Sequence, residues 1–242
     1  MAVQITPLKG LEADYRPVDW DFAVAQKAEI AAHWSKLVAE KPRMFNGTVL
    51  LQHGWSLIDG VYRTGYTPVD YASFIAWIHF GQPGSPRRNG FAMAALQAAD
   101  GPFVLGVMGA HTANAGKVYF PGGTPDMTDV TADGKVDLSG SVWRELAEET
   151  GLGADEVVIS QPWLLAVDAY RAALLRPARL IYDATMAQRI LRERIAAQAD
   201  RELADIVIVA SPEEIDLERT PAFAVAYMRQ VFAGDHFCAV SS

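Results

Sequence analysis

Three glutamates and one arginine stand close together in the stretch RELAEET, residues 144–150. Glu145 precedes Glu148 by three positions and Glu149 by four, and residues at these spacings share one face of an α-helix. Like charges placed this way repel one another, so the helix itself gains nothing from them. Three hard oxygen ligands suit Mg²⁺ or Mn²⁺ better than zinc or copper. The pattern therefore predicts a divalent-metal site; the alternative is a solvated acidic face, which is what most charge clusters are.

The elements before this helix form a strand, a turn and a loop. Val118–Phe120 is strand-like and leads into the turn Pro121-Gly122-Gly123, and a long polar loop separates the turn from the helix. In this context RELAEETGL, residues 144–152, resembles the signature helix of the Nudix hydrolases. That family has the pattern Arg-Glu-aliphatic-x-Glu-Glu-x-Gly-aliphatic after a glycine-containing loop, and every fixed position of the helical half is matched here.

The resemblance implies roles for the matched residues. Glu145 and Glu149 would be the principal metal ligands with Glu148 close behind, and a backbone carbonyl at Gly122 or Gly123 would add another. Glycine makes such a close approach of the backbone easy.

One position departs from the family pattern. The family has a glutamate eight residues before the arginine, where this chain has Val136. Asp137 is the nearest carboxylate, and we expect it to pair with Arg144 and hold the loop against the helix.

Other candidates lie outside the motif. Asp200 and Glu202 precede the strand ADIVIV and are candidates for the catalytic base, although most exposed acids in such turns have no catalytic role. Arg87 and Arg88 are candidates for phosphate binding, because arginine can bind phosphate through two hydrogen bonds; the alternative is a pair of solvated loop arginines. We expect the side chain of Trp143 to pack in the core; the alternative is that it stacks on a nucleotide base.

Composition limits the class of protein. Half of the 242 residues are hydrophobic and the formal net charge is −8, which excludes a disordered chain and argues against a nucleic-acid partner. The five histidines lack zinc-ligand spacing, and no apolar run is long enough to span a membrane. Cys238 is the single cysteine, and the first residues lack the pattern of a signal peptide. We expect a cytoplasmic protein, and the family resemblance adds a homodimer as an expectation.

Hydrophobic periodicity predicts a mixed α/β fold. Helices are expected at 21–40, 71–80, 184–197 and 221–232, and strands at 3–8, 48–52, 55–67, 91–98, 103–108, 157–167, 174–182 and 204–209. The resemblance implies the Nudix α/β/α sandwich with a mixed sheet over residues 86–242. Residues 1–85 would be an N-terminal helix-hairpin extension.

The N-terminal region narrows the expected substrate. Trp34, the PRMFNGT segment at 42–48 and DGVYRTGY at 59–66 are similar to the leader of the UDP-sugar pyrophosphatase branch of the Nudix family. The alternative is a helix and hairpin that only extend the sheet. We therefore expect hydrolysis of a nucleoside diphosphate linked to another group, with UDP-glucose first. The alternatives are ADP-ribose, a dinucleotide or coenzyme A, and a nucleotide-sensing Nudix domain without turnover.

Overall fold

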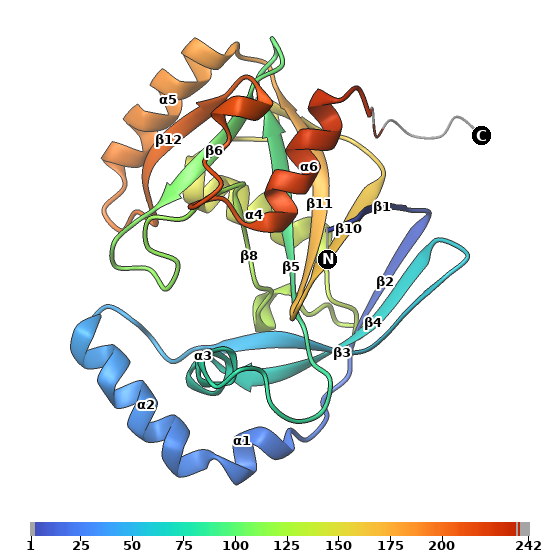
Figure 1. Cartoon of the computed structure of the whole chain (residues 1–242), viewed down its shortest axis with the longest axis vertical. Coiled ribbons are helices and arrows are strands. Elements are labelled where there is room, and N and C mark those ends of the chain that lie inside the picture. The colour runs from blue at the N-terminus through green and yellow to red at the C-terminus, as the bar shows by residue number, and fades with distance from the viewer. Residues whose placement is uncertain (1–2, 236, 238–242) are drawn as a thin grey trace.

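The computed structural model describes residues 3–235 and residue 237 (Figure 1). Its helices are α1 Asp21–Ala25, α2 Lys27–Glu40, α3 Tyr71–His79, α4 Leu138–Thr150, α5 Ala184–Ala197 and α6 Ala222–Phe232, with 3-10 turns η1 Met127–Asp129 and η2 Pro212–Glu214. Its strands are β1 Ile5–Leu8, β2 Gly10–Tyr15, β3 Thr48–Ile58, β4 Val61–Asp70, β5 Asn89–Gln97, β6 Phe103–Met108, β7 Val118–Tyr119, β8 Gly122–Gly123, β9 Val157–Ile159, β10 Trp163–Asp168, β11 Arg171–Leu180 and β12 Leu203–Val209.

The centre of the fold is a large mixed sheet in the order β1-β10-β11-β5-β6-β12, with β7, β8 and β9 attached to its edges and interior. β11 runs parallel to β5, whereas its pairing with β10 and the β12–β6 pairing are antiparallel. The predicted mixed α/β arrangement is confirmed by this sheet. Strand β1 belongs to it through its pairing with β10, although β1 comes from the first residues of the chain.

Strand β5 shows why the sheet is covered on both faces. Its sequence FAMAALQ is apolar almost without interruption, which is typical of a strand buried on both sides. Because successive side chains point to opposite faces, Phe91 and Met93 enter one core and Ala92 and Leu96 the other.

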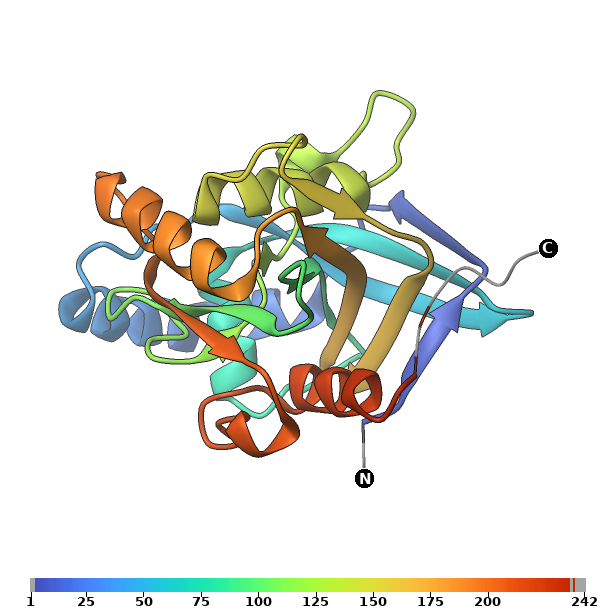
Figure 2. The same ribbon diagram turned by 90° about the horizontal axis from the view of Figure 1, so that it is seen from above.

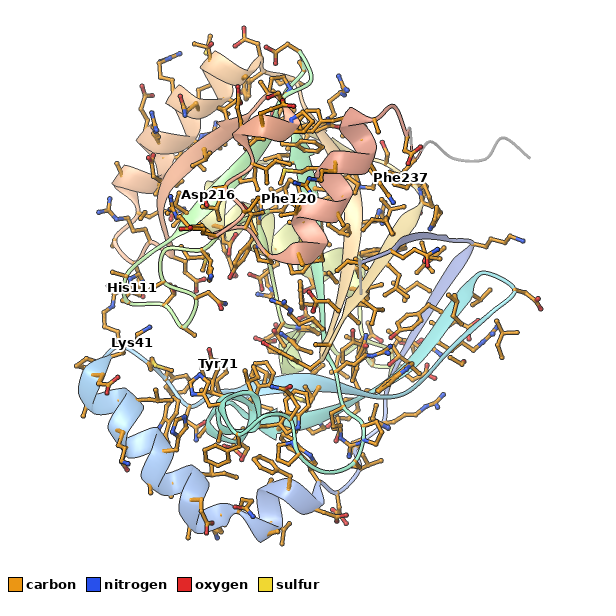
Figure 3. The ribbon with its side chains drawn as sticks, in the orientation of Figure 1. Lys41, Tyr71, His111, Phe120, Asp216 and Phe237 are labelled. Carbon is orange, nitrogen blue, oxygen red and sulfur yellow. The ribbon has the colours of Figure 1, made fainter. Side chains whose placement is uncertain are left out.

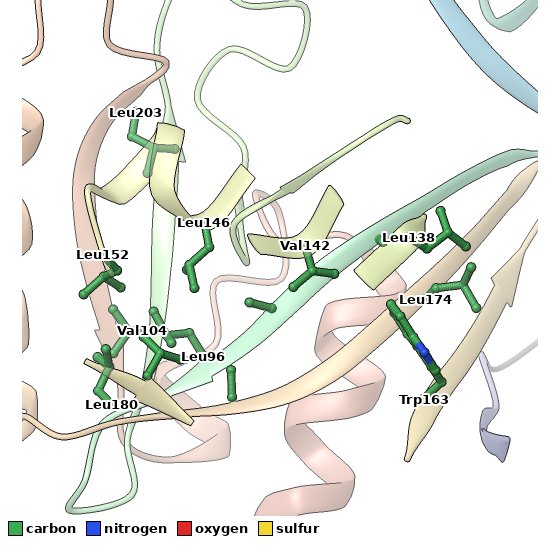
Figure 4. Close-up of a cluster of buried hydrophobic side chains, with 14 of the residues drawn as sticks. Leu96, Val104, Leu138, Val142, Leu146, Leu152, Trp163, Leu174, Leu180 and Leu203 are labelled. Atoms are coloured by element: carbon green, nitrogen blue, oxygen red, sulfur yellow. The ribbon is translucent and has the colours of Figure 1, made fainter. Parts of the chain in front are cut away.

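Helices cover both faces of the central sheet, as the apolar strand β5 requires. α4 and α5 pack on one face through Leu146 and Leu191, and α6 packs on the other through Tyr227 and Met228. Figure 2 shows α4 and α5 above the sheet and α6 below it. Figure 4 shows how Val142 and Leu146 of α4 meet the sheet residues Leu96 and Val104. The result is a helix–sheet–helix arrangement in which α4 is fixed by its apolar face.

The N-terminal segment adds a small sheet in the order β2-β4-β3, and α1, α2 and α3 contribute to a separate apolar core around Trp77 and Leu51. β3 and β4 form the hairpin expected at Asp59-Gly60, where both residues have positive φ, as a tight hairpin turn requires. The division of the chain at residue 85 and the separate extension stay predictions.

Several predicted boundaries were wrong. The first hairpin strand does not stop at residue 52 but continues to Ile58 across an irregularity between His53 and Ser56. The helix expected at 21–40 is two helices, because Gln26 leaves the helical conformation. Strand β2 was not predicted. None of the helices in the described part of the chain is long and apolar enough to cross a membrane, and Cys238 lies outside the described residues.

Candidate functional site

Helix α4 carries the predicted glutamates, and its apolar positions determine which of them is buried. Leu138, Val142 and Leu146 follow one another at four-residue spacing and are all buried in the main core. Glu149 comes three residues after Leu146 and therefore lies on the inner side of the helix, where only 4% of the residue is exposed. Gly151, with φ of 72°, ends the helix in the left-handed conformation that glycine adopts easily.

The Gly122-Gly123 turn lies directly against these glutamates. Both glycines pair with β5 as the short strand β8, and the backbone of Gly122 lies near enough to Glu149 to act against the rise in the pKa of its carboxyl. A Cβ atom on Gly122 would collide with Met93, and one on Gly123 would collide with the carboxylate of Glu145. The turn therefore brings main chain and carboxylates together at a distance that larger residues would not permit.

The carboxylates of Glu145 and Glu149 have too little positive charge around them to balance their own negative charge. Burial raises the pKa of Glu149 well above its usual range, and the neighbouring charges of Glu145 and Glu202 raise it further. Burial likewise raises the pKa of Glu145 to about 7, although the guanidinium of Arg144 acts in the opposite direction. An added cation would relieve both effects.

The predicted partner of Arg144 was wrong. Its guanidinium donates to Asp129 at 3.0 Å, not to Asp137. Asp137 is instead the N-cap of α4 and accepts a hydrogen bond from the amide of Gly140. Arg144 also contacts Glu145 at 2.9 Å and Glu148 at 3.3 Å.

An inserted loop explains the error. Val130 and Val136 bridge each other, so residues 130–136 close on themselves and Asp129 lies next to Asp137, whose amide donates to the Asp129 carbonyl at 2.8 Å. The number of residues between Asp129 and Asp137 does not reveal that the loop brings them together. The signal that could have identified Asp129 is the capping pair Asp126 and Asp129, which fixes the 3-10 turn η1.

The loop after α5 faces the motif helix. A cavity of about 420 Å³ is lined by Glu145, Glu148, Glu149, Gln198, Ala199, Asp200 and Glu202. Gln198 fixes the loop to α4 by donating to the carbonyl of Glu148 at 2.9 Å. The structure therefore brings the motif glutamates together with both late acidic candidates, although fifty residues separate them in the sequence. We call this space the carboxylate pocket.

Two tyrosines that sequence reasoning missed lie beside the carboxylate pocket. The charge of Glu202 contributes to the raised pKa of Tyr71, and the charges of Glu149 and Glu202 to that of Tyr119, burial being the main cause for both. Figure 3 shows Tyr71 on the N-terminal side of the molecule, facing the part that contains α4. Tyr71 of the N-terminal segment is therefore near enough to the site for the charge of Glu202 to act on it.

Arg87 and Arg88 are not among the residues that line the carboxylate pocket. Arg87 donates to the carbonyl of Asp19 at 3.2 Å, and the guanidinium of Arg88 lies 3.9 Å from the ring centre of Trp55. Their role in substrate binding stays a prediction. Trp143 packs against the main core, in agreement with the core-packing interpretation.

The residues present fit a hard divalent cation by their chemistry. Glu145, Glu148 and Glu149 offer carboxylate oxygens at one cavity, and Gly123 is close enough to Glu145 for its main chain to take part. Within the described residues, no three His, Cys, Asp or Glu side chains already converge as a metal-ligand group. Binding a cation would therefore require side-chain rotation, which the exposed Glu148 allows.

No protein-family model and no curated protein matches the chain. Among solved structures, it is similar to a Nudix hydrolase from M. smegmatis, RenU, with a TM-score of 0.41 and 18% identity over 63% of this chain and 92% of that one. It is also similar to the MutT protein from Methanosarcina mazei Go1, with a TM-score of 0.39 and 20% identity over 64% and 99%. A third similar structure is the NUDIX domain of Shewanella oneidensis NrtR complexed with ADP ribose, with a TM-score of 0.37 and 17% identity over 66% and 96%.

Proposed function

We propose that the protein is a Nudix-type hydrolase that uses Mg²⁺ or Mn²⁺ to cleave the diphosphate linkage of a nucleoside diphosphate joined to another group. The observation that carries this proposal is the contact between the Gly122-Gly123 turn and two acids, the partly buried Glu145 and the buried Glu149. A helix with no functional constraint would not bury an acid beside a second acid, because burial of an unpaired charge is costly.

Glu145, Glu149, Glu148 and the main chain at Gly123 would hold the metal. The bound cation would neutralise charge on the diphosphate and lower the pKa of water. The chain itself keeps these ligands in place: Arg144 ties α4 to Asp129, and the apolar row of α4 fixes the helix on the sheet. Arg144 therefore acts as a positioning residue in this proposal.

Glu202 is our candidate for the residue that accepts a proton from the attacking water. It lines the carboxylate pocket, and its charge acts on both Glu145 and Glu149. Asp200 lines the same pocket and is exposed, as Glu202 is, but its carboxylate already pairs with Arg43. A base must be within reach of the proton that it accepts, so the position of Glu202 favours it over Asp200.

Within this reaction class, a sugar nucleotide such as UDP-glucose is the first candidate substrate. Its support is the resemblance of residues 42–48 and 59–66 to the leader of UDP-sugar pyrophosphatases. The hairpin β3–β4 and the turn that precedes it contain these residues.

The experiment measures products from UDP-glucose, ADP-ribose, coenzyme A and a dinucleotide with Mg²⁺ or Mn²⁺. The chain is compared with Glu149→Gln and with the control Glu193→Gln, which changes an exposed glutamate on α5 paired with Arg189. We expect a nucleoside monophosphate from UDP-glucose and its loss only in Glu149→Gln. If only another compound of this panel is cleaved, the proposed substrate is wrong and the proposed reaction stands. Tight nucleotide binding without turnover of any substrate would identify a sensor and contradict the proposal.

A further inference from the structure

A second cavity adjoins the carboxylate pocket and has the opposite character. It has a volume of about 590 Å³, and its charged or titratable lining residues are Arg43, Arg201 and His111. No carboxylate is among the residues that line it in the described part of the chain. We call it the arginine pocket. A cationic cavity is unexpected on a chain of net charge −8, and it indicates an anionic ligand.

The two pockets are neighbours on the same loop. Gln198 and Ala199 line both of them, so the pockets lie on either side of these two residues. Asp200 marks the boundary, because it lines the carboxylate pocket while its side chain pairs with Arg43 of the arginine pocket. One molecule with two adjacent anionic groups would therefore reach both pockets.

The ion pair at this boundary is weak enough to be exchanged. The side chains of Arg43 and Asp200 are 55% and 84% exposed, and such surface pairs contribute little to stability. A phosphate offers arginine two parallel hydrogen bonds and more charge than a single carboxylate. Arg201 has no ion-pair partner among the described residues, so its guanidinium needs no such exchange.

The N-terminal part of the chain places Arg43 at the site. Lys41 follows α2 and donates to the carbonyl of Thr112 at 2.6 Å, which fixes the turn that carries Arg43 against the loop that carries His111. Figure 3 shows Lys41 and the His111 loop meeting from opposite parts of the molecule. Gly109 supports this loop, because its amide donates to the carbonyl of Glu202 and a Cβ there would collide with His111.

We propose that the arginine pocket binds the phosphate of the substrate diphosphate that the carboxylate pocket does not hold. Arg43 and Arg201 contact this phosphate, and Asp200 releases Arg43 when it arrives. The inference rests on the proposed function for the identity of the ligand. Under this proposal, residues just after α2 help to recognise the substrate, so the N-terminal region does more than extend the small sheet.

The test is calorimetric titration of the full chain with inorganic phosphate in the presence of EDTA, so that no metal contributes. We compare Arg43→Gln, Arg201→Gln, the double variant, Asp200→Asn and the control Arg189→Gln, an exposed arginine on α5 that lines neither pocket. Loss of one arginine should weaken binding by about tenfold or more, because at least one hydrogen bond between charged groups is lost. Asp200→Asn should bind phosphate more tightly, since a competing charge is gone.

Circular dichroism and thermal unfolding would establish that each variant is folded, as expected for exposed side chains. Equal phosphate affinity in the chain and the double variant would overturn the inference, as would no binding of phosphate by the unchanged chain. A double variant that hydrolyses substrate with unchanged KM would also overturn it and leave the proposed function standing. If phosphate binding depends on Arg43 and Arg201 but the chain hydrolyses no diphosphate, the arginine pocket is a phosphate site and only the proposed function is contradicted.

Discussion

The carboxylate of Glu145 occupies the space that a side chain at Gly123 would need. A Cβ atom at position 123 would lie within 2.5 Å of Cδ of Glu145, whereas non-bonded carbon atoms prefer about 3.5–4.0 Å. The turn before the loop and the second residue of the motif are therefore fitted to each other. This contact makes the glycine part of the site.

Gly123→Ala should reduce turnover more than tenfold, because the added methyl group must displace the Glu145 carboxylate. We expect metal affinity, measured by titration with Mn²⁺, to fall with it. The control is Gly10→Ala, where an added Cβ makes ordinary contacts of 3.4 Å with Val61. Unchanged metal affinity and turnover in Gly123→Ala would show that Glu145 does not need its present position.

Asp129→Ala should lower both stability and activity, because Arg144 loses the buried carboxylate that ties α4 to η1. The loss of a charged hydrogen bond at a buried site predicts a decrease of about 1–3 kcal/mol in the free energy of unfolding. Asp137→Ala should cost about 1 kcal/mol as a lost N-cap but leave turnover unchanged. Urea unfolding measures the loss of stability, and initial rates measure the loss of activity. If Asp137→Ala lost more activity than Asp129→Ala, Asp137 and not Asp129 would be the functional partner of Arg144.

Glu202→Gln should lower kcat by about 10²- to 10⁴-fold with a smaller change in KM, as expected for loss of a general base. The shape of the side chain is preserved and its surroundings are open, so the fold should not change. Asp200→Asn provides the comparison, because it alters a second acid in the same pocket. A larger loss of kcat in Asp200→Asn would assign proton transfer to Asp200 instead.

Glu156 should make stability depend on pH in the acid range. Its hydrogen bonds with Arg194, together with those from Gly153 and Tyr182, lower the pKa of the carboxyl to about 2, against the cost of burial. The charged form is thus favoured in the folded chain. The contribution is complete above the unfolded pKa of about 4.3 and is lost as the pH falls through about 2.

Glu156→Gln measures this contribution. The difference in unfolding free energy between the chain and the variant should be about 1–2 kcal/mol at pH 7, as for a hydrogen-bonded ion pair, and should shrink below about pH 4.5. Arg194 also donates to the carbonyl of Gly151 at the end of α4, so the same pair joins α5 to the motif helix. Urea unfolding at several pH values gives the comparison. A difference that stays constant from pH 7 to pH 3 would contradict the assignment.

Local patterns predicted much of the fold because they depend on near neighbours. The Asp59-Gly60 hairpin and the N-cap Asp70 of α3 follow from turn and capping chemistry that the sequence displays directly. Strand β2 was missed although Leu11, Ala13 and Tyr15 alternate with polar residues and pack on the main core, because the segment is only six residues long and includes a glycine and two acids. Its strand conformation comes from parallel pairing with β4, which is a long-range contact.

The site was only partly predictable for the same reason. Spacing on one helix was enough to bring Glu145, Glu148 and Glu149 together. Asp129 was missed because the loop at 130–136 doubles back, and Arg43 was missed because nothing near it in the sequence points to Asp200. Residues that reach a site through tertiary contacts have no local signature.

The position of β1 has a consequence for how the protein is made. β1 leaves the ribosome before its partner β10, which is synthesised only after the motif helix is complete. At the opposite edge of the sheet, β12 and the Glu202 turn before it emerge later than the other strands of this sheet. In the nascent chain β1 therefore stays unpaired until β10 has emerged, and the carboxylate pocket is complete only when β12 has docked.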